Sequence, residues 1–446
     1  MDNLSEKSLQ KGIRSLNEWI DSFGDWEPDD SLIVPEKKVN EVFTRLIERL
    51  KCNYPFEHPS YAGQMLKPPH PLAWAAYAIA MSINPNNHAL DGGPPSSEME
   101  KEVIASLARF FGYENTYLGH LTSSGTIANL EALWIARESH PKKKIAFSDQ
   151  AHYTHGRMCS VLRVEGLKIP VLDDGTFDLD AVDPEDIGTM VVTLGTTGLG
   201  DVEPLDQILP WAKKHGIRVH IDAAYGGFFR TLKDSKLING TAWQRMQEAD
   251  SIVVDPHKHG LQPYGCGCVL FKDPEVGKFY KHDSPYTYFT SDDLHLGEIS
   301  LECSRAGASA VAFWTTLQLF PLEEKTGFGP ILSNCRSAAL TMYELTNSSS
   351  KLTSYKKPEL DIIGYFPTEA STLSEISERS KEIFQKGMSD RSFYLSLYKI
   401  SAKSFTKRHP DFEVDAEDVT ILRSVFMKPE HDNFVKELFS RIENCC

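Results

Sequence analysis

The sequence predicts an α/β fold in which a mostly parallel central sheet is followed by a smaller C-terminal α/β region. The first observation is that short β-rich runs alternate with helical segments between about residues 117 and 272. The second is that strand and helix patterns resume after residue 325. With 446 residues, the chain is also long enough for more than one domain. We therefore expect an N-terminal helical arm, a large domain and a small domain, with these bounds: 1–60, 61–325 and 326–446.

The β-rich runs are short and apolar, as is typical of strands that are buried on both faces. Helical segments such as residues 204–216 lie between them. Because strands that alternate with helices form parallel sheets, the helices should cover both faces. Five strands are expected: KIAFS (144–148), GTMVVTLG (188–195), IRVHID (217–222), SIVVD (251–255) and CVLF (268–271).

The two ends of the chain carry their own patterns. Residues 84–97 form a loop rich in Asn, Gly and Pro, after which Ser97 and Glu100 predict the capping box of a helix. Residues 347–361 predict a flexible connector, and residues 419–427 a strand. The N-terminal arm is predicted from apolar residues at helical spacing: Val39, Val42, Phe43, Leu46, Ile47 and Leu50.

Composition excludes several classes of function. The net charge of -15, from 47 basic and 62 acidic residues, argues against a surface for nucleic acid or anionic membranes. No run approaches the roughly 18 apolar residues of a membrane helix, and the polar first residues do not suggest a signal peptide. The eight cysteines follow no regular framework, which indicates reduced thiols and a cytoplasmic location.

The segment HLTSSGTIANLEALWIA (120–136) passes from hydroxylated residues through Gly125 into a predicted helix. A helix N-terminus has unpaired N–H groups and the positive end of a dipole, so it binds a phosphate readily. Ser123, Ser124 and Thr126 add hydroxyl groups. Such clusters also cap helices routinely, so by itself the segment leaves both interpretations open.

Asp222 ends an apolar strand in RVHIDAAYGGFF (218–229), where a buried carboxylate is costly unless it is paired. A protonated aromatic nitrogen would be a suitable partner, and the small residues that follow leave room for a flat ring. The alternative is an aspartate that caps the next turn.

Lys258 follows another apolar strand in ADSIVVDPHKHG (249–260). A lysine in a partly apolar site loses its charge by desolvation and becomes an amine nucleophile, as a Schiff base with an aldehyde cofactor requires. A surface turn would explain the lysine alone, and ordinary loop residues would explain His152 and Thr197 alone. A phosphate cradle, His152, Thr197, Asp222 and Lys258, each after its own strand, together indicate a cofactor site.

These segments resemble the group II pyridoxal-phosphate-dependent amino-acid decarboxylases, which act on glutamate, cysteine sulfinate, aspartate, tyrosine and other aromatic amino acids. The resemblance extends from HPSYAGQML (58–66) to ECSRAG (302–307), and more loosely to the C-terminus. It implies pyridoxal 5'-phosphate as cofactor and the fold type I, or aspartate aminotransferase-like, architecture. Its most specific motifs are HIDAAYGG and DPHKHG, supported by SSGTIANLEAL and DQAHYTHG.

The resemblance implies a role for each residue around the cofactor ring. Lys258 would form the internal aldimine, and Asp222 would keep the pyridine nitrogen protonated. His152 would stack on one face of the ring and Ala224 on the other, with Thr197 beside it. Phosphate contacts are implied for four residues: Ser124, Gly125, Thr126 and His257.

The resemblance also implies the substrate contacts and the reaction. Arg305 would receive the α-carboxylate, and decarboxylation would give a quinonoid intermediate that either Tyr286 or Tyr288 protonates. Gln64 matches a position that contacts the distal carboxylate of acidic substrates. Three aromatic residues could equally frame an aromatic pocket, so an aromatic substrate stays open: Tyr61, Trp74 and Tyr77.

The resemblance further implies a homodimer with active sites at the interface, in which residues 85–97 lie near the partner's cofactor. A carbon–carbon lyase or an aminotransferase on the same fold is the alternative enzyme, and a non-catalytic cofactor-binding protein is a weaker one. A metal protein is the remaining alternative, built on these residues: His257, His259, Cys266 and Cys268. Buried thiols in a strand explain the two cysteines better than zinc does.

Overall fold

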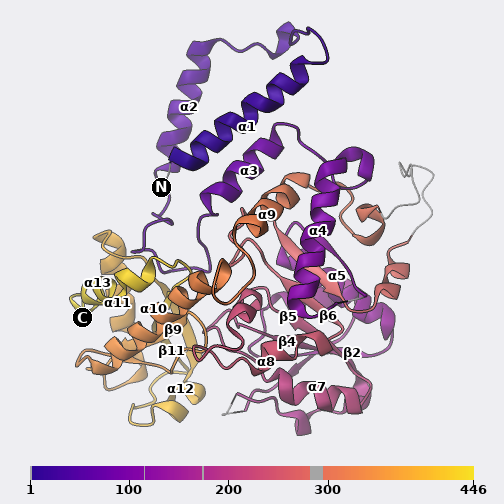
Figure 1. The fold of residues 1–446 in the computed structure, drawn as a ribbon. Coiled ribbons are helices and arrows are strands. Elements are labelled where there is room, and N and C mark those ends of the chain that lie inside the picture. Colours follow the sequence, from indigo (N-terminus) through magenta and orange to yellow (C-terminus); the bar gives the residue numbers. More distant parts are fainter. Residues whose placement is uncertain (1–2, 115, 173–174, 282–294) are drawn as a thin grey trace.

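A seven-stranded sheet forms the centre of the computed structural model, which describes residues 3–114, 116–172, 175–281 and 295–446 (Figure 1). The strand order is β1-β7-β6-β5-β4-β2-β3, and β7 alone runs antiparallel to its neighbours. The predicted mostly parallel sheet is therefore confirmed. The strands are β1 (Leu118–Thr122), β2 (Lys144–Ser148), β3 (Gly166–Ile169), β4 (Ile187–Thr193), β5 (Arg218–Asp222), β6 (Ser251–Val254) and β7 (Gly267–Phe271).

Helices cover this sheet on both faces, which explains why every residue of β1, β4, β6 and β7 is buried. Helix α5 packs on β4, β6 and β7, whereas α4 packs on β1 and α7 on β5. The α-helices are α3 (Pro71–Met81), α4 (Pro94–Phe111), α5 (Gly125–Ser139), α6 (Thr154–Leu162), α7 (Leu205–Lys214), α8 (Thr241–Gln244) and α9 (Gly307–Leu319). The 3-10 helices are η1 (Asp30–Leu32), η2 (Leu90–Gly92), η3 (Leu179–Ala181), η4 (Pro184–Asp186), η5 (Gly227–Leu232), η6 (Met246–Glu248), η7 (Pro274–Phe279) and η8 (Leu296–Ile299).

The start of α4 corrects the predicted capping box. The helix begins at Pro94, so Ser97 and Glu100 lie inside it and both are buried. Instead of capping the helix, the Glu100 carboxylate accepts a hydrogen bond from the backbone N–H of Leu121 at 3.0 Å. It therefore ties α4 to β1.

A second, four-stranded sheet follows in the C-terminal region, and all its strand pairs are antiparallel in the order β10-β11-β9-β8. Residues 347–361 were predicted as a flexible connector, but they contain β8, which pairs with β9. The elements are α10 (Phe328–Ser348), β8 (Leu352–Ser354), β9 (Ile362–Pro367), α11 (Leu373–Ser389), β10 (Ser396–Ser401), α12 (Ala402–Arg408), β11 (Asp418–Val425) and α13 (His431–Glu443).

Buried cations join the two sheets and the N-terminal segment. Arg336 on α10 donates to the carbonyl oxygens of Leu237 and Leu360. Lys428 donates from Nζ to three carbonyl oxygens in the segment that precedes α3, at distances of 2.7–3.0 Å: Phe56, His58 and Tyr61. Because both cations are buried, these carbonyl oxygens satisfy donors that solvent cannot reach.

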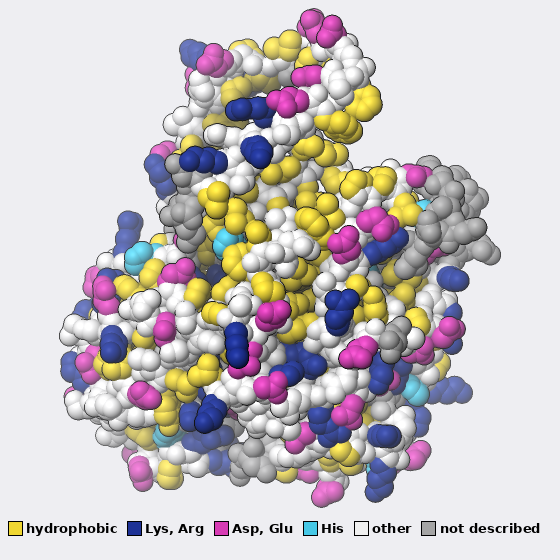
Figure 2. Space-filling model, in the orientation of Figure 1, with side chains coloured by type: hydrophobic (Ala, Val, Ile, Leu, Met, Phe, Trp, Pro, Cys, Tyr) yellow, Lys and Arg dark blue, Asp and Glu magenta, His cyan; other side chains and the backbone are white. Residues whose placement is uncertain are grey.

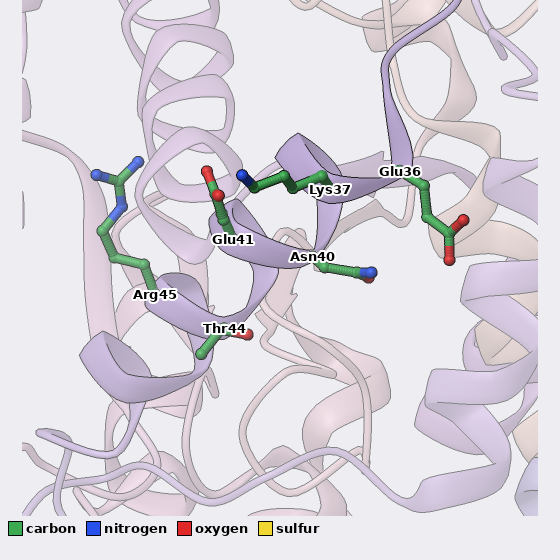
Figure 3. A pocket seen from close by; sticks show the side chains of 6 residues that line it. All are labelled: Glu36, Lys37, Asn40, Glu41, Thr44 and Arg45. Carbon is green, nitrogen blue, oxygen red and sulfur yellow. The ribbon is translucent and has the colours of Figure 1, made fainter.

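The N-terminal arm consists of α1 (Asn3–Asp21) and α2 (Glu36–Leu50) and projects from the rest of the chain (Figure 1). No residue of α2 is buried, and Figure 2 shows hydrophobic side chains on the surface of this arm. A hollow of about 730 Å³ lies beside α2, lined by polar residues of that helix: Glu36, Lys37, Asn40, Glu41, Thr44 and Arg45 (Figure 3). The arm thus exposes apolar surface that a monomeric protein normally covers.

Candidate active site

Chemically reactive side chains gather where the parallel strands end. Asp222 is the last residue of β5, and its neighbours in the sheet are Thr193 at the end of β4 and Val253 near the end of β6. Because parallel strands end at one edge of a sheet, the segments that follow them meet there. Asp222 ends β5, and the segments that follow β4 and β6 contain Thr197 and Lys258; the sequence predicted all three as site residues.

Asp222 is a buried carboxylate with two hydrogen-bond donors; its side chain is 8% exposed. The backbone N–H of Ala224 donates to Oδ1 at 3.1 Å, and Nε2 of His155 donates to Oδ2 at 2.9 Å. Burial by itself raises the pKa of Asp222, but the hydrogen bond and charge of His155 and the charge of Lys258 outweigh it. The pKa therefore lies below its ordinary value, and the carboxylate is ionised.

His155 was missed by the sequence analysis, although it stands in the motif DQAHYTHG, three residues after His152. It lies in the first turn of α6, and its side chain is fully buried. The only signal in the sequence was a histidine in the segment that begins α6. Its role becomes visible only when the structure places Asp222 of β5 beside it.

Lys258 and Asp255 form an ion pair in the turn after β6. Nζ of Lys258 lies 3.1 Å from Oδ2 of Asp255, and the lysine side chain is 22% exposed. The same carboxylate oxygen lies 3.5 Å from Nε2 of His257, whose Nδ1 donates to the carbonyl oxygen of Cys266 at 2.7 Å. The sequence predicted an amine in a partly apolar site, whereas the structure gives Lys258 an anionic partner that the sequence analysis did not identify.

The start of α5 lies against this ion pair. A Cβ atom at position 125 would lie 2.3 Å from Oδ1 of Asp255, so only glycine fits here. Ser124 caps the helix by accepting from the N–H of Ile127 at 3.3 Å. Glu302 also places a carboxylate oxygen 2.8 Å from the backbone nitrogen of Ser123. Two carboxylates therefore gather at this helix start, as expected for an N-terminus that attracts anions.

His152 is half-buried beside these charges. Its Nδ1 accepts a hydrogen bond from the N–H of Thr154 at 3.2 Å. Burial lowers its pKa, and Lys258 lowers it further, while Asp222 acts in the opposite direction. The ring is therefore neutral near neutral pH, which suits stacking on an aromatic group better than a charged ring would.

Arg423 is a second residue that the sequence analysis missed. It is buried in β11 and donates from Nη2 to the carbonyl oxygen of Thr197 at 2.7 Å and from Nε to that of Gly198 at 2.6 Å. Nη1 donates to Gly63, the residue before the exposed Gln64. All of these acceptors are uncharged, so the guanidinium has no anionic partner among them. The signal in the sequence was a single arginine within an apolar strand.

Arg305 lies in a different environment from the one its predicted role requires. Its Nη1 atom lies 2.9 Å from a carboxylate oxygen of Glu100 and 2.6 Å from the carbonyl oxygen of Leu121. Nη2 donates to the carbonyl oxygen of Asn87. This arginine already has a buried anionic partner and holds the loop at Asn87 against β1. Its role as the α-carboxylate ligand stays a prediction that this geometry does not favour.

The remaining predicted residues divide into two groups. Ser124, Thr126, Ala224 and His257 lie in segments that follow β1, β5 and β6, as expected. The two candidate proton donors lie outside the described residues: Tyr286 and Tyr288.

Two kinds of feature are absent from the part of the chain that the structure describes. It contains no cluster of three or more His, Cys, Asp or Glu side chains arranged to hold a metal ion. It also contains no helix that is long and apolar enough to cross a membrane. Cys266 and Cys268 are buried free thiols, and burial raises the pKa of each.

Glu203 is a buried carboxyl group beside Asp222. It accepts hydrogen bonds from the hydroxyl of Ser148 and from the backbone N–H of Thr193. Burial and the charge of Asp222 raise its pKa and the hydrogen bonds lower it, and the net result is a pKa of about 8. Of these two neighbouring groups, Asp222 is therefore ionised and Glu203 is protonated at neutral pH.

The residues at this edge fit pyridoxal phosphate. An anion-attracting helix start would hold the phosphate, Asp222 is an ionised acceptor for a protonated ring nitrogen, and Lys258 is an amine for the aldehyde. The half-buried ring of His152 and the small side chain of Ala224 are suited to the two faces of a flat ring.

Comparisons with known proteins agree with this fit. A family model described as the pyridoxal-dependent decarboxylase conserved domain matches residues 56–363. The chain is 29% identical over 316 residues to a probable L-tyrosine/L-aspartate decarboxylase of Methanosphaera stadtmanae, covering 68% of this chain and 77% of that protein. It is 27% identical over 473 residues to an L-tyrosine decarboxylase of Enterococcus faecium, covering 80% and 76%.

Solved structures share the fold. Mouse CSAD superposes with a TM-score of 0.77 at 17% identity, covering 100% of this chain and 99% of that one. Oryza sativa TDC with PLP and tryptamine superposes with a TM-score of 0.75 at 14% identity, with the same coverage. The predicted fold type I architecture is therefore confirmed.

Glu203→Gln should weaken the dependence of stability on pH. Burial raises the pKa of Glu203 from its ordinary value of 4.5 to about 8, so between these pH values the folded chain keeps a proton that the unfolded chain has released. The free energy of unfolding therefore falls as pH rises across this range, by at most about 1.4 kcal/mol per pH unit from this group. Denaturant unfolding from about pH 5 to about pH 8 measures the slope; Glu275→Gln, at an exposed carboxylate, is the control. Equal slopes for wild type and Glu203→Gln would show that the pKa of Glu203 is not raised in the folded chain.

Proposed function

The chain belongs to the pyridoxal-dependent decarboxylase family, and from this premise we propose which residues hold the cofactor and act on the substrate. The enzyme is a carboxy-lyase that uses pyridoxal phosphate to release CO2 from an L-amino acid. The observation that carries the assignment of residues is the convergence of Asp222, Lys258 and the start of α5 at one edge of the sheet.

Pyridoxal phosphate supplies an aldehyde for an amine and a protonated ring that accepts the electrons of the broken bond. We assign the aldehyde-binding amine to Lys258. Its Nζ must lose a proton to act as a nucleophile, and Oδ2 of Asp255, 3.1 Å away, is placed to accept it. Asp222 holds the proton on the ring nitrogen, and His152 covers one face of the ring and excludes water from it.

We assign the substrate α-carboxylate to Arg423 rather than Arg305. A buried guanidinium whose acceptors are all neutral has a net positive charge to offer an anion, whereas the charge of Arg305 is already matched by Glu100. Arg423 also contacts Thr197, a residue of the segment that follows β4. Binding there would orient the bond to the departing carboxylate and leave the rest of the substrate to other contacts.

We propose L-tyrosine or L-aspartate as the substrate. The support is that relatives from Methanosphaera stadtmanae and Methanocaldococcus jannaschii are named L-tyrosine/L-aspartate decarboxylases, the first of them as probable. Both amino acids end in an oxygen that the exposed amide of Gln64 could bind. This proposal keeps both the acidic and the aromatic class and excludes amino acids whose side chains are purely aliphatic.

We also propose a cytoplasmic homodimer. All eight cysteines are free thiols, as is typical of a reducing compartment. The exposed apolar side chains of the arm support a second copy of the chain as the partner, because association of the two arms would bury them. These side chains include Trp19, Phe23, Leu32, Phe43, Leu46 and Leu50.

Lys258→Ala should abolish both covalent cofactor attachment and CO2 release, because no other described amine at the site pairs with Asp255. The purified protein is loaded with pyridoxal phosphate, reduced with borohydride and analysed by peptide mass spectrometry. CO2 release is measured with the twenty amino acids and cysteine sulfinate. Lys272→Ala, at an exposed lysine, should behave like the wild type. Cofactor fixed to another lysine would refute the assignment of Lys258, and CO2 from neither tyrosine nor aspartate would refute that of the substrate.

Arg423→Lys should lower kcat/KM by about ten- to a hundredfold, since a lysine cannot reproduce the paired donors of a guanidinium. Arg305→Lys should lower it much less. Both variants are first titrated with pyridoxal phosphate, so that a loss of cofactor binding is not mistaken for a loss of substrate binding. The reverse order of effects would restore the role predicted for Arg305.

Replacing Phe43 and Ile47 together with aspartate should convert the dimer to a monomer, because charges one helical turn apart would replace apolar surface at the contact. Sedimentation velocity measures the change, and circular dichroism checks the helix content. A matched variant at polar positions of the same helix, Glu41→Gln with Arg45→Gln, should stay dimeric. A wild-type protein that sediments as a monomer with full activity would exclude the dimer.

A further inference from the structure

His155 and Asp222 form a buried pair that the reaction as described above does not use. The histidine lies in the first turn of α6, its side chain is fully buried, and its Nε2 atom lies 2.9 Å from Oδ2 of Asp222. The other carboxylate oxygen is held by the backbone of Ala224. With one donor on each oxygen, the plane of the carboxylate is fixed.

The position of His155 is not explained by its own hydrogen bonding. Its second ring nitrogen, Nδ1, is buried and has no hydrogen-bond partner in the described part of the chain. An unsatisfied buried ring nitrogen is costly. The interaction that offsets this cost is the hydrogen bond to an ionised carboxylate, which is among the stronger ones in proteins.

The other titratable groups around Asp222 already have partners of their own. His220 binds Ser251 through Nδ1 and Asn129 through Nε2, each at 2.9 Å. Lys258 is paired with Asp255, and Glu203 accepts from two donors. Among the described residues, His155 is therefore the side chain that donates a hydrogen bond to Asp222.

We propose that His155 is a positioning residue for the cofactor: by donating from Nε2 to Oδ2 of Asp222, it holds this carboxylate ionised and in the plane in which it meets the pyridine nitrogen. The inference rests on the proposed role of Asp222. It adds a residue that never touches the cofactor and acts through the carboxylate alone. Removing it should make the ring nitrogen a weaker base.

Two substitutions separate the hydrogen bond from the space that the ring fills. His155→Leu removes the donor and keeps much of the volume, whereas His155→Gln has an amide nitrogen that can reach the position of Nε2. His120 offers a matched control, since its Nε2 atom lies 3.0 Å from Glu131 and both side chains are fully buried. His120→Leu therefore removes another buried histidine–carboxylate pair that is not assigned to the cofactor.

The decisive readout is the nitrogen NMR signal of full-length protein loaded with pyridoxal phosphate labelled with nitrogen-15 in the ring. Wild type, His155→Gln and His120→Leu should give the signal of a protonated ring nitrogen, and His155→Leu should shift it toward that of the neutral ring. The dissociation constant of the cofactor should rise about tenfold in His155→Leu. That rise should vanish with a 1-deaza analogue, whose ring has a C–H group in place of the nitrogen.

The outcomes distinguish this inference from the function on which it rests. If Asp222→Asn keeps the protonated signal, the role of Asp222 is wrong. If Asp222→Asn loses that signal while His155→Leu keeps it, or if the deaza analogue shows the same rise, the inference about His155 alone is overturned. Should His155→Leu fail to fold, His155→Asn, whose amide is too short to reach Oδ2, takes its place in the same measurements.

Discussion

The ionised carboxylate of Asp222, buried at the end of β5, is the feature on which the surrounding structure depends. A buried charge without donors would cost several kcal/mol, and here a backbone N–H and a histidine meet its two oxygens. The nearby carboxyl group of Glu203 has a raised pKa and stays protonated at neutral pH, so it adds no second negative charge beside Asp222. In the function proposed above, this ionised carboxylate is the group that would meet the cationic ring nitrogen of the cofactor.

Close packing also brings the start of α5 next to Lys258 at the same edge of the sheet. Gly125 lets the start of α5 approach the ion pair of Asp255 and Lys258, where even one methyl group would overlap the carboxylate. The positive end of the helix and the lysine therefore lie on the same acidic side chain. An anionic group bound at this helix start would therefore lie close to the amine of Lys258, because the helix start and the lysine both contact Asp255.

Much of this architecture could be predicted from the sequence, because parallel strands buried on both faces leave a strong pattern. All five expected strands exist, but β1 and β3 were missed: β1 contains Gly119 and His120, and β3 is a short strand at the sheet edge. The comparisons support the family and cofactor. The partners Asp255, His155 and Arg423 were not foreseen, since a pairing across elements becomes visible only when the elements are placed side by side.

The bonds of Lys428 have a consequence for how the molecule moves. One amine holds the carbonyl groups of Phe56, His58 and Tyr61, which lead from the arm, while its own backbone follows β11 of the second sheet. The second sheet cannot swing away from the first without either breaking these three bonds or drawing the root of the arm along. Because of these bonds, a displacement of the second sheet would also displace the segment that connects the arm to the rest of the chain.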